Sequence, residues 1–63
     1  MIAIINNRTN EYGITKSSIT PGKVAEYKSG DDVRSGIVQR VAGKAVLLDG
    51  GRQTHWRNVT EVR

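Results

Sequence analysis

The chain has 63 residues, which is enough for one small domain with a single hydrophobic core. It has no cysteine and one histidine, so the composition argues against a disulfide framework and against a structural zinc site. Ten Lys and Arg residues stand against six Asp and Glu, and the resulting net charge of +4 favours nucleic acid or an acidic protein surface as the partner. The same excess of charge can also serve solubility alone.

Residues 1–29 are polar and irregular after a short apolar start. Residues 2–5 predict a short strand; they are too few to span a membrane, and no basic region precedes them as in a signal peptide. We therefore expect a cytoplasmic domain that does not bind membranes. Residues 12–15 would pair with residues 2–5 in a hairpin. Residues 16–22 have loop composition, and residues 23–27 predict a strand, with a short helix over 23–28 as the alternative.

Regular patterning is clearer in residues 30–63. A turn at residues 28–31 leads into a long strand over 32–41, whose buried side we expect to carry Val33, Ile37 and Val41. Gly36 in its middle indicates a bend, a bulge or a close approach of another segment. The remaining elements expected are a tight turn at 42–44, a central strand at 45–48, a hairpin turn at 49–51, a strand at 52–57, a 3₁₀ turn at 58–60 and a last strand at 61–63.

Four groups of residues give these elements a familiar order: Gly30-Asp31-x-Val33, Gly36-Ile37-Val38, Val46-Leu47-Leu48-Asp49-Gly50, and Trp56 with Val59 and Val62. In these positions residues 30–63 resemble the SH3-like barrel superfamily, in the style of its KOW and Tudor domains. The resemblance implies an all-β fold, a small five-stranded SH3-like half-open barrel with a short 3₁₀ turn before the last strand. Residues 1–63 would then form a single domain, in which residues 1–29 are the irregular N-terminal portion.

Residues 30–34 are also similar in style to the plasmid-type dihydrofolate reductases. The Val-Gln-Ile-Tyr segment of that family is replaced here by Arg52-Gln53-Thr54-His55-Trp56, which argues against the activity. No other catalytic pattern is present, because His55 has no partner at useful spacing and no serine lies in a nucleophile-elbow setting. Asp31 and Asp32 would point to opposite faces of a strand, so the two carboxylates would not readily share one proton or one metal ion. We therefore expect a binding module that is not an enzyme and uses no cofactor or metal.

Basic side chains concentrate in the second half. Arg34 and Arg40 have the same parity in the long strand, opposite to Val33, so we expect both on its solvent face. His55 and Arg57 share one face of the strand at 52–57, and Trp56 lies on the other, where we expect it to pack in the core; the alternative is that it stacks on a base. Tyr27 is a candidate for an exposed aromatic platform, as is Tyr12. The candidate nucleic-acid-binding residues are Arg34, Arg40, Lys44, Arg52, His55, Arg57 and Tyr27.

Two functions remain open on these observations, besides a face that is merely solvated. The first is a nucleic-acid-binding module, for DNA or RNA, whose basic face follows the phosphates. The second is an adaptor or inhibitor that docks on an acidic protein, with residues 2–5 available as an edge strand for a homodimer.

Overall fold

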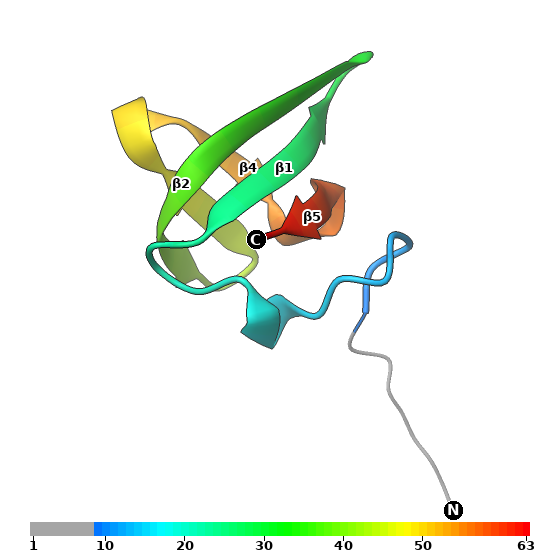
Figure 1. Ribbon diagram of the computed structural model, residues 1–63, viewed down its shortest axis with the longest axis horizontal. Coiled ribbons are helices and arrows are strands. Elements are labelled where there is room, and N and C mark those ends of the chain that lie inside the picture. The colour runs from blue at the N-terminus through cyan, green and yellow to red at the C-terminus, as the bar shows by residue number, and fades with distance from the viewer. Residues whose placement is uncertain (1–8) are drawn as a thin grey trace, which may run out of the picture.

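The computed structural model describes residues 9–63, which form one five-stranded antiparallel sheet in the order β4-β3-β2-β1-β5 (Figure 1). The strands are β1 (Val24–Ser29), β2 (Asp32–Ala42), β3 (Ala45–Leu48), β4 (Gln53–His55) and β5 (Val59–Val62). Single 3₁₀ turns are η1 (Lys16–Ser18), η2 (Asp49–Gly51) and η3 (Trp56–Asn58). The predicted all-β class and the 3₁₀ turn before the last strand are confirmed. The sheet is not closed into a barrel.

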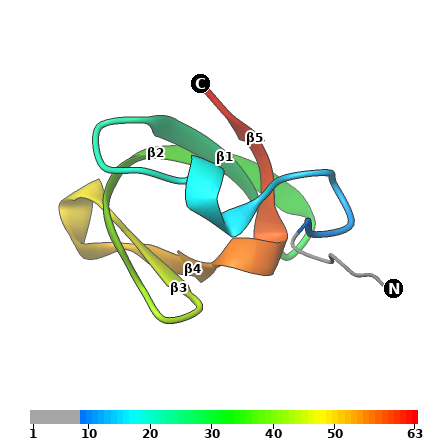
Figure 2. The same cartoon turned by 90° about the horizontal axis from the view of Figure 1, so that it is seen from below.

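Strand β2 belongs to both halves of the sheet. Its residues 32–37 pair with β1, and its residues 38–42 pair with β3. The register shifts between Val38 and Arg40, which leaves Gln39 as an extra residue, a β-bulge that bends the strand. Because of this bend, β3 and β4 fold back opposite β1 and β2, and the apolar core lies between the two halves (Figure 2).

The bulge also changes which side chains of β2 face the core. Gly36 and Val38 are buried, whereas Val33 and Ile37 are 60% and 45% exposed. The prediction that Val33 and Ile37 lie on the buried side is therefore wrong. Val41, which follows the bulge, is half-buried opposite Val46. The core-facing residues of β2 therefore have even numbers before the bulge and odd numbers after it.

Another segment of the chain, residues 48–49, closely approaches Gly36, which is one of the predicted alternatives. A side-chain carbon added there would lie 3.1 Å from Asp49 Oδ1 and 3.3 Å from Leu48 Cβ. A larger residue at this position would thus push η2 away from β2. The bulge itself falls three residues later.

A tight turn at residues 20–23 connects η1 to β1. The backbone N–H of Lys23 donates to the carbonyl of Thr20, and the turn between them has Pro21 in its second position and Gly22 at φ +92° in its third. These are the residues that a type II turn requires. The strand predicted at 23–27 is confirmed as part of β1, and the alternative helix over 23–28 is wrong.

The C-terminal boundaries differ from the predicted ones by about two residues. Strand β4 ends at His55, and the 3₁₀ turn starts at Trp56 instead of residue 58, so β5 begins at Val59. The segment 49–51 carries the positive φ angles expected of Gly50 and Gly51 but forms a 3₁₀ turn, η2. The tight turn predicted at 42–44 is confirmed, with Gly43-Lys44 linking β2 to β3.

Within residues 9–63, the core consists of eight side chains drawn from β1, β2, β3, η3, β5 and the segment before β1: Ile19, Ala25, Tyr27, Val38, Val46, Leu48, Trp56 and Val59. Burial of Trp56 agrees with the prediction. Tyr27 is only 4% exposed, so the prediction that it forms an exposed platform is wrong. Its register opposite Val59 and Arg34 directs its ring into the space between the sheet halves.

The segment before η1 is attached to the sheet through one buried side chain. Asn10 Nδ2 donates to the carbonyl oxygens of Trp56 and Val59, at 3.0 and 2.8 Å. Its Oδ1 accepts from the backbone N–H groups of Tyr12 and Ile14, at 2.9 and 3.0 Å. All the hydrogen-bonding capacity of the amide nitrogen and oxygen is used, which explains how this polar group tolerates burial.

No strand forms at residues 12–15, contrary to prediction. The described part of this segment makes a turn, with a single bridge between Thr9 and Thr15. The strand predicted at residues 2–5 lies outside the described residues.

Candidate nucleic-acid interface

Acidic residues are scarce in the part of the chain that forms β2, β3, β4 and η3. Residues 32–60 contain two acidic residues, Asp32 and Asp49, and five basic ones: Arg34, Arg40, Lys44, Arg52 and Arg57. Asp49 is already engaged, since its Oδ1 accepts from the backbone N–H of Ile37 at 2.9 Å and lies 3.5 Å from Arg52 Nη2. Asp32 likewise lies within ion-pairing distance of Arg34, so the positive charges left without a partner in these elements are those of Arg40, Lys44 and Arg57.

Arg34 and Arg40 lie on opposite faces of the sheet. Arg34 is in register with the buried Tyr27 and therefore lies on the core side of β2, although its side chain is exposed. Its Nη2 atom lies 3.8 Å from Asp32 Oδ2. Arg40 follows the bulge and lies opposite Leu47, on the face that points away from the core. The prediction that both share one solvent face is wrong, because the bulge at Gln39 inverts the parity between them.

Arg52 is directed toward η2. Besides its ion pair with Asp49, its Nε donates to the Asp49 carbonyl at 3.4 Å, and its guanidinium lies beside Gly36. Arg52 and Arg34 are thus both partnered by carboxylates, and neither joins the surface described next.

Arg40 and His55 are brought to one face by the pairing of β2, β3 and β4. The register places Ala42, Ala45 and His55 in one row across the three strands. Directly opposite residues in antiparallel strands point to the same side of a sheet, so the neighbouring row carries Arg40, Leu47 and Gln53 on that side as well. Lys44 lies beside this face in the β2–β3 turn.

A hollow opens on this face. It has a volume of about 470 Å³ and is lined by Ala42, Lys44, Ala45, Gln53, Thr54 and His55. Ala42 and Ala45 are its smallest side chains and lie opposite each other in β2 and β3. Lys44, Gln53 and His55 supply polar groups around it.

Arg57 lies next to this hollow, held by two contacts. His55 Nδ1 accepts the backbone N–H of Arg57 at 3.1 Å, and the Arg57 guanidinium lies 5.1 Å from the centre of the Trp56 ring. A neutral imidazole that accepts at Nδ1 carries its proton on Nε2, so His55 presents a donor to solvent. Trp56 is itself fixed to the β2–β3 turn, because its backbone N–H donates to the Lys44 carbonyl at 2.9 Å.

We call these four residues, Arg40, Lys44, His55 and Arg57, the basic face. Among residues 9–63, no carboxylate lies within ion-pairing distance of Arg40, Lys44 or Arg57. The structure thus gathers four of the seven predicted site residues. Arg34 and Arg52 lie elsewhere, and Tyr27 is in the core.

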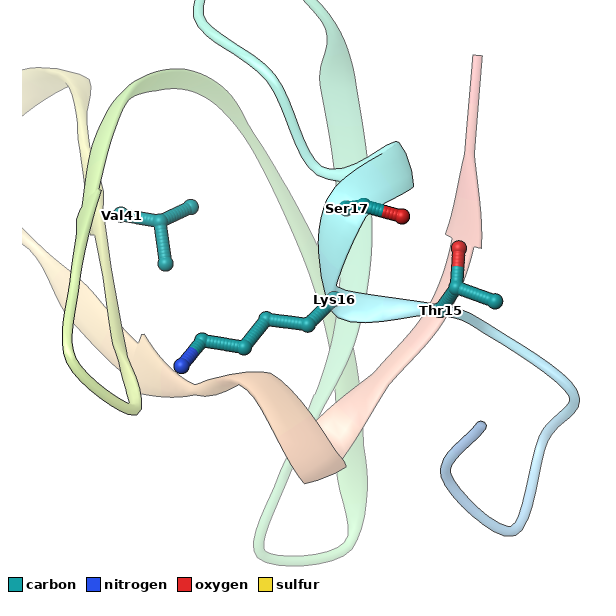
Figure 3. Close-up of a pocket in the computed structure, with 4 residues that line it drawn as sticks. All are labelled: Thr15, Lys16, Ser17 and Val41. Atoms are coloured by element: carbon teal, nitrogen blue, oxygen red, sulfur yellow. The ribbon is translucent and has the colours of Figure 1, made fainter. Parts of the chain in front are cut away.

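A second groove of about 700 Å³ lies between η1 and the end of β2 (Figure 3). It is lined by Thr15, Lys16, Ser17 and Val41, and the Lys16 side chain extends along it toward the Val41 side. The groove offers one charged group and mainly aliphatic walls, so it provides no set of groups for acid–base or nucleophilic chemistry.

Sequence reasoning missed the residues that shape the hollow, namely Ala42, Ala45 and Gln53. Their signal lies in the two-residue turn Gly43-Lys44, which fixes Ala42 opposite Ala45 once the turn is assigned. Two small side chains that face each other then indicate a hollow between the larger side chains around them.

The described part of the chain, residues 9–63, has no group of three His, Asp or Glu side chains placed to hold a metal ion. None of its helices is long and apolar enough to cross a membrane. The fold is that of a small five-stranded antiparallel β-sheet domain. No protein-family model, curated protein or solved structure matches the chain.

Proposed function

We propose that this chain is a small SH3-like binding module, not an enzyme, and that it binds nucleic acid through the basic face. The SH3-like assignment is supported by the order of the strands, a meander in which the last strand returns to pair with β1. The single 3₁₀ turn η3 immediately before β5 is a further supporting feature.

One observation carries the nucleic-acid proposal. Arg40, Lys44 and Arg57 have no acidic partner among the described residues, whereas Arg34, Arg52 and Arg63 each have one. Lys44 lines the hollow, and Arg40 lies one row away on the same face of the sheet. Unpaired guanidinium and ammonium groups around a hollow provide charge-assisted hydrogen bonds for phosphate oxygens.

The test is a binding titration of labelled DNA and RNA oligonucleotides, followed by fluorescence anisotropy at several salt concentrations. We expect the affinity to fall steeply with salt, because each phosphate contact releases about 0.7–0.9 of a counterion. The double variant Arg40→Ala/Lys44→Ala should bind more weakly and reduce the slope of log affinity against log salt by roughly 1.5.

The matched control is Lys28→Ala/Arg34→Ala, which removes the same net charge from the β1–β2 hairpin. It should leave most of the affinity intact. Equal losses in both variants would indicate attraction by overall charge, and the basic face would not be the site. Absence of binding at low salt would refute the nucleic-acid function.

A protein partner is the second candidate function, and it is favoured by apolar side chains on the outer face of β1 and β2. Ile37 lies exposed beside its cross-strand partner Val24, and Val33 is exposed on the same face of β2. Exposed aliphatic side chains of this kind can anchor another chain. Sedimentation equilibrium with and without Ile37→Ser tests the homodimer form of this candidate: a wild-type dimer that the variant dissociates supports it, and a monomeric wild type rejects it.

A further inference from the structure

We infer that the ligand of the basic face is single-stranded nucleic acid, and that the base of one nucleotide binds in the hollow lined by Ala42 and Ala45. This inference rests on the proposed function and specifies the class of nucleic acid that the face accepts. It follows from what the domain could insert into a duplex and from the shape of the hollow.

Duplex grooves are usually read by an α-helix or a two-stranded ribbon that enters them. Residues 9–63 contain only 3₁₀ turns of three residues and no α-helix. The ribbon of sufficient length is the β1–β2 hairpin, and its tip carries Asp31 and Asp32. Two carboxylates at the leading end would be repelled by the phosphates that line a groove, so this hairpin is unsuited to enter one.

The other hairpin is also unsuited to duplex binding. The β2–β3 hairpin ends in the two-residue turn Gly43-Lys44 and has one cation at its tip. The basic face around it covers only the short strands β3 and β4 and the last part of β2. It is therefore matched to two or three phosphates of one strand, whereas a duplex offers phosphates on both sides of a groove.

The hollow has the features that an unpaired base needs. Its lining includes the methyl side chains of Ala42 and Ala45, which suit a flat apolar ring face. Its walls include the Gln53 amide, which both donates and accepts, and His55, whose Nε2 proton is directed away from the Arg57 contact. These groups can bond to a base edge that is free only when the base is unpaired.

A neighbouring base has a platform next to the hollow. The Arg57 guanidinium is held over the Trp56 ring, and its own accessible plane is available for stacking. Guanidinium planes stack on bases of any identity, so this contact favours single strands without imposing a sequence. Lys44, which lines the hollow, and Arg40, one row away on the same face, would then contact the adjoining phosphates.

The test compares a labelled single strand of about ten nucleotides with the blunt duplex of the same sequence. We expect the single strand to bind roughly tenfold more tightly or better, as loss of one stacked base typically costs that much. The variant Ala42→Leu fills the hollow from an exposed position. It should weaken single-strand binding by roughly tenfold and leave the salt slope unchanged, since it removes no charge.

The control is Ser35→Leu, which adds the same bulk to an exposed position on the outer face of the β1–β2 half. It should bind as the wild type does. If Ala42→Leu lowers the thermal midpoint, Ala45→Leu provides a second way to fill the hollow. Equal affinity for duplex and single strand would overturn this inference and leave the proposed function standing. The same holds if the filled variants bind as the wild type does while Arg40→Ala/Lys44→Ala still weakens binding. A lack of binding to either form would refute the proposed function itself.

Discussion

Replacing Asn10 by alanine removes four hydrogen bonds from a single buried side chain. Two of them bind Trp56 and Val59, at the start of η3 and of β5, and two organise the turn around Tyr12 and Ile14. Asn10 is only 5% exposed, so water cannot fully replace the lost partners without opening the segment. At about 1 kcal/mol net for each bond, with some relaxation, we expect Asn10→Ala to lower the free energy of unfolding by roughly 2–4 kcal/mol.

This loss would be large for a domain of this size. At about 0.05–0.15 kcal/mol per residue, the free energy of unfolding of the whole chain is roughly 3–9 kcal/mol. Asn10→Asp should destabilise more than Asn10→Ala, because a carboxylate keeps both acceptor bonds but turns an unpaired negative oxygen toward two carbonyl oxygens in a buried site.

Urea denaturation, followed by Trp56 fluorescence and by circular dichroism, measures both effects. Asn58→Ala is the matched control, since Asn58 is exposed and its amide makes one long bond of 3.4 Å to Thr54 Oγ1. We expect that control to change the free energy of unfolding by less than about 0.5 kcal/mol. If Asn10→Ala costs no more than Asn58→Ala, the attachment of the N-terminal segment through Asn10 does not contribute as argued.

Three further predictions concern the sheet. Val38→Ala should lower the free energy of unfolding by roughly 1.5–3 kcal/mol in chemical denaturation, because Val38 is fully buried. Val33→Ala should lower it by less than about 0.5 kcal/mol, because Val33 is exposed. The reverse order would contradict the register of β2. Gly36→Ala should lower stability by about 1–3 kcal/mol in a thermal melt, since the added carbon meets Asp49 and Leu48. Arg63→Ala should cost at most about 1 kcal/mol, as its ion pair with Glu26 is partly exposed, and a larger loss would show that the pair fixes the end of β5.

Most strands could be predicted from the sequence because their turns are specified locally. Gly30-Asp31 and Gly43-Lys44 each supply the residue types of a two-residue hairpin, so β1, β2 and β3 follow from them. Boundaries near the C-terminus were less accurate. Trp56 fits a strand by alternation, but its backbone N–H bonds to Lys44 and its carbonyl accepts from Asn10, and these non-local contacts end β4 at His55.

The faces of β2 could not be predicted from alternation alone. A bulge is a property of pairing between strands, and nothing in the residues around Gln39 marks the point where the register shifts. The error spread to the candidate site, because the opposite faces of Arg34 and Arg40 follow directly from the bulge. Asn10 was missed for a similar reason: its two carbonyl partners lie more than 45 residues away in the sequence.

The measurement that tests the proposed function most directly is a map of backbone amide NMR shifts as a short unpaired oligonucleotide is added to the wild-type protein. We predict that the shifts concentrate in residues 40–45 and 53–57, with the β1–β2 hairpin nearly unchanged. Shifts centred on Asp31, Val33 and Arg34, or no shifts at low salt, would contradict nucleic-acid binding by the basic face.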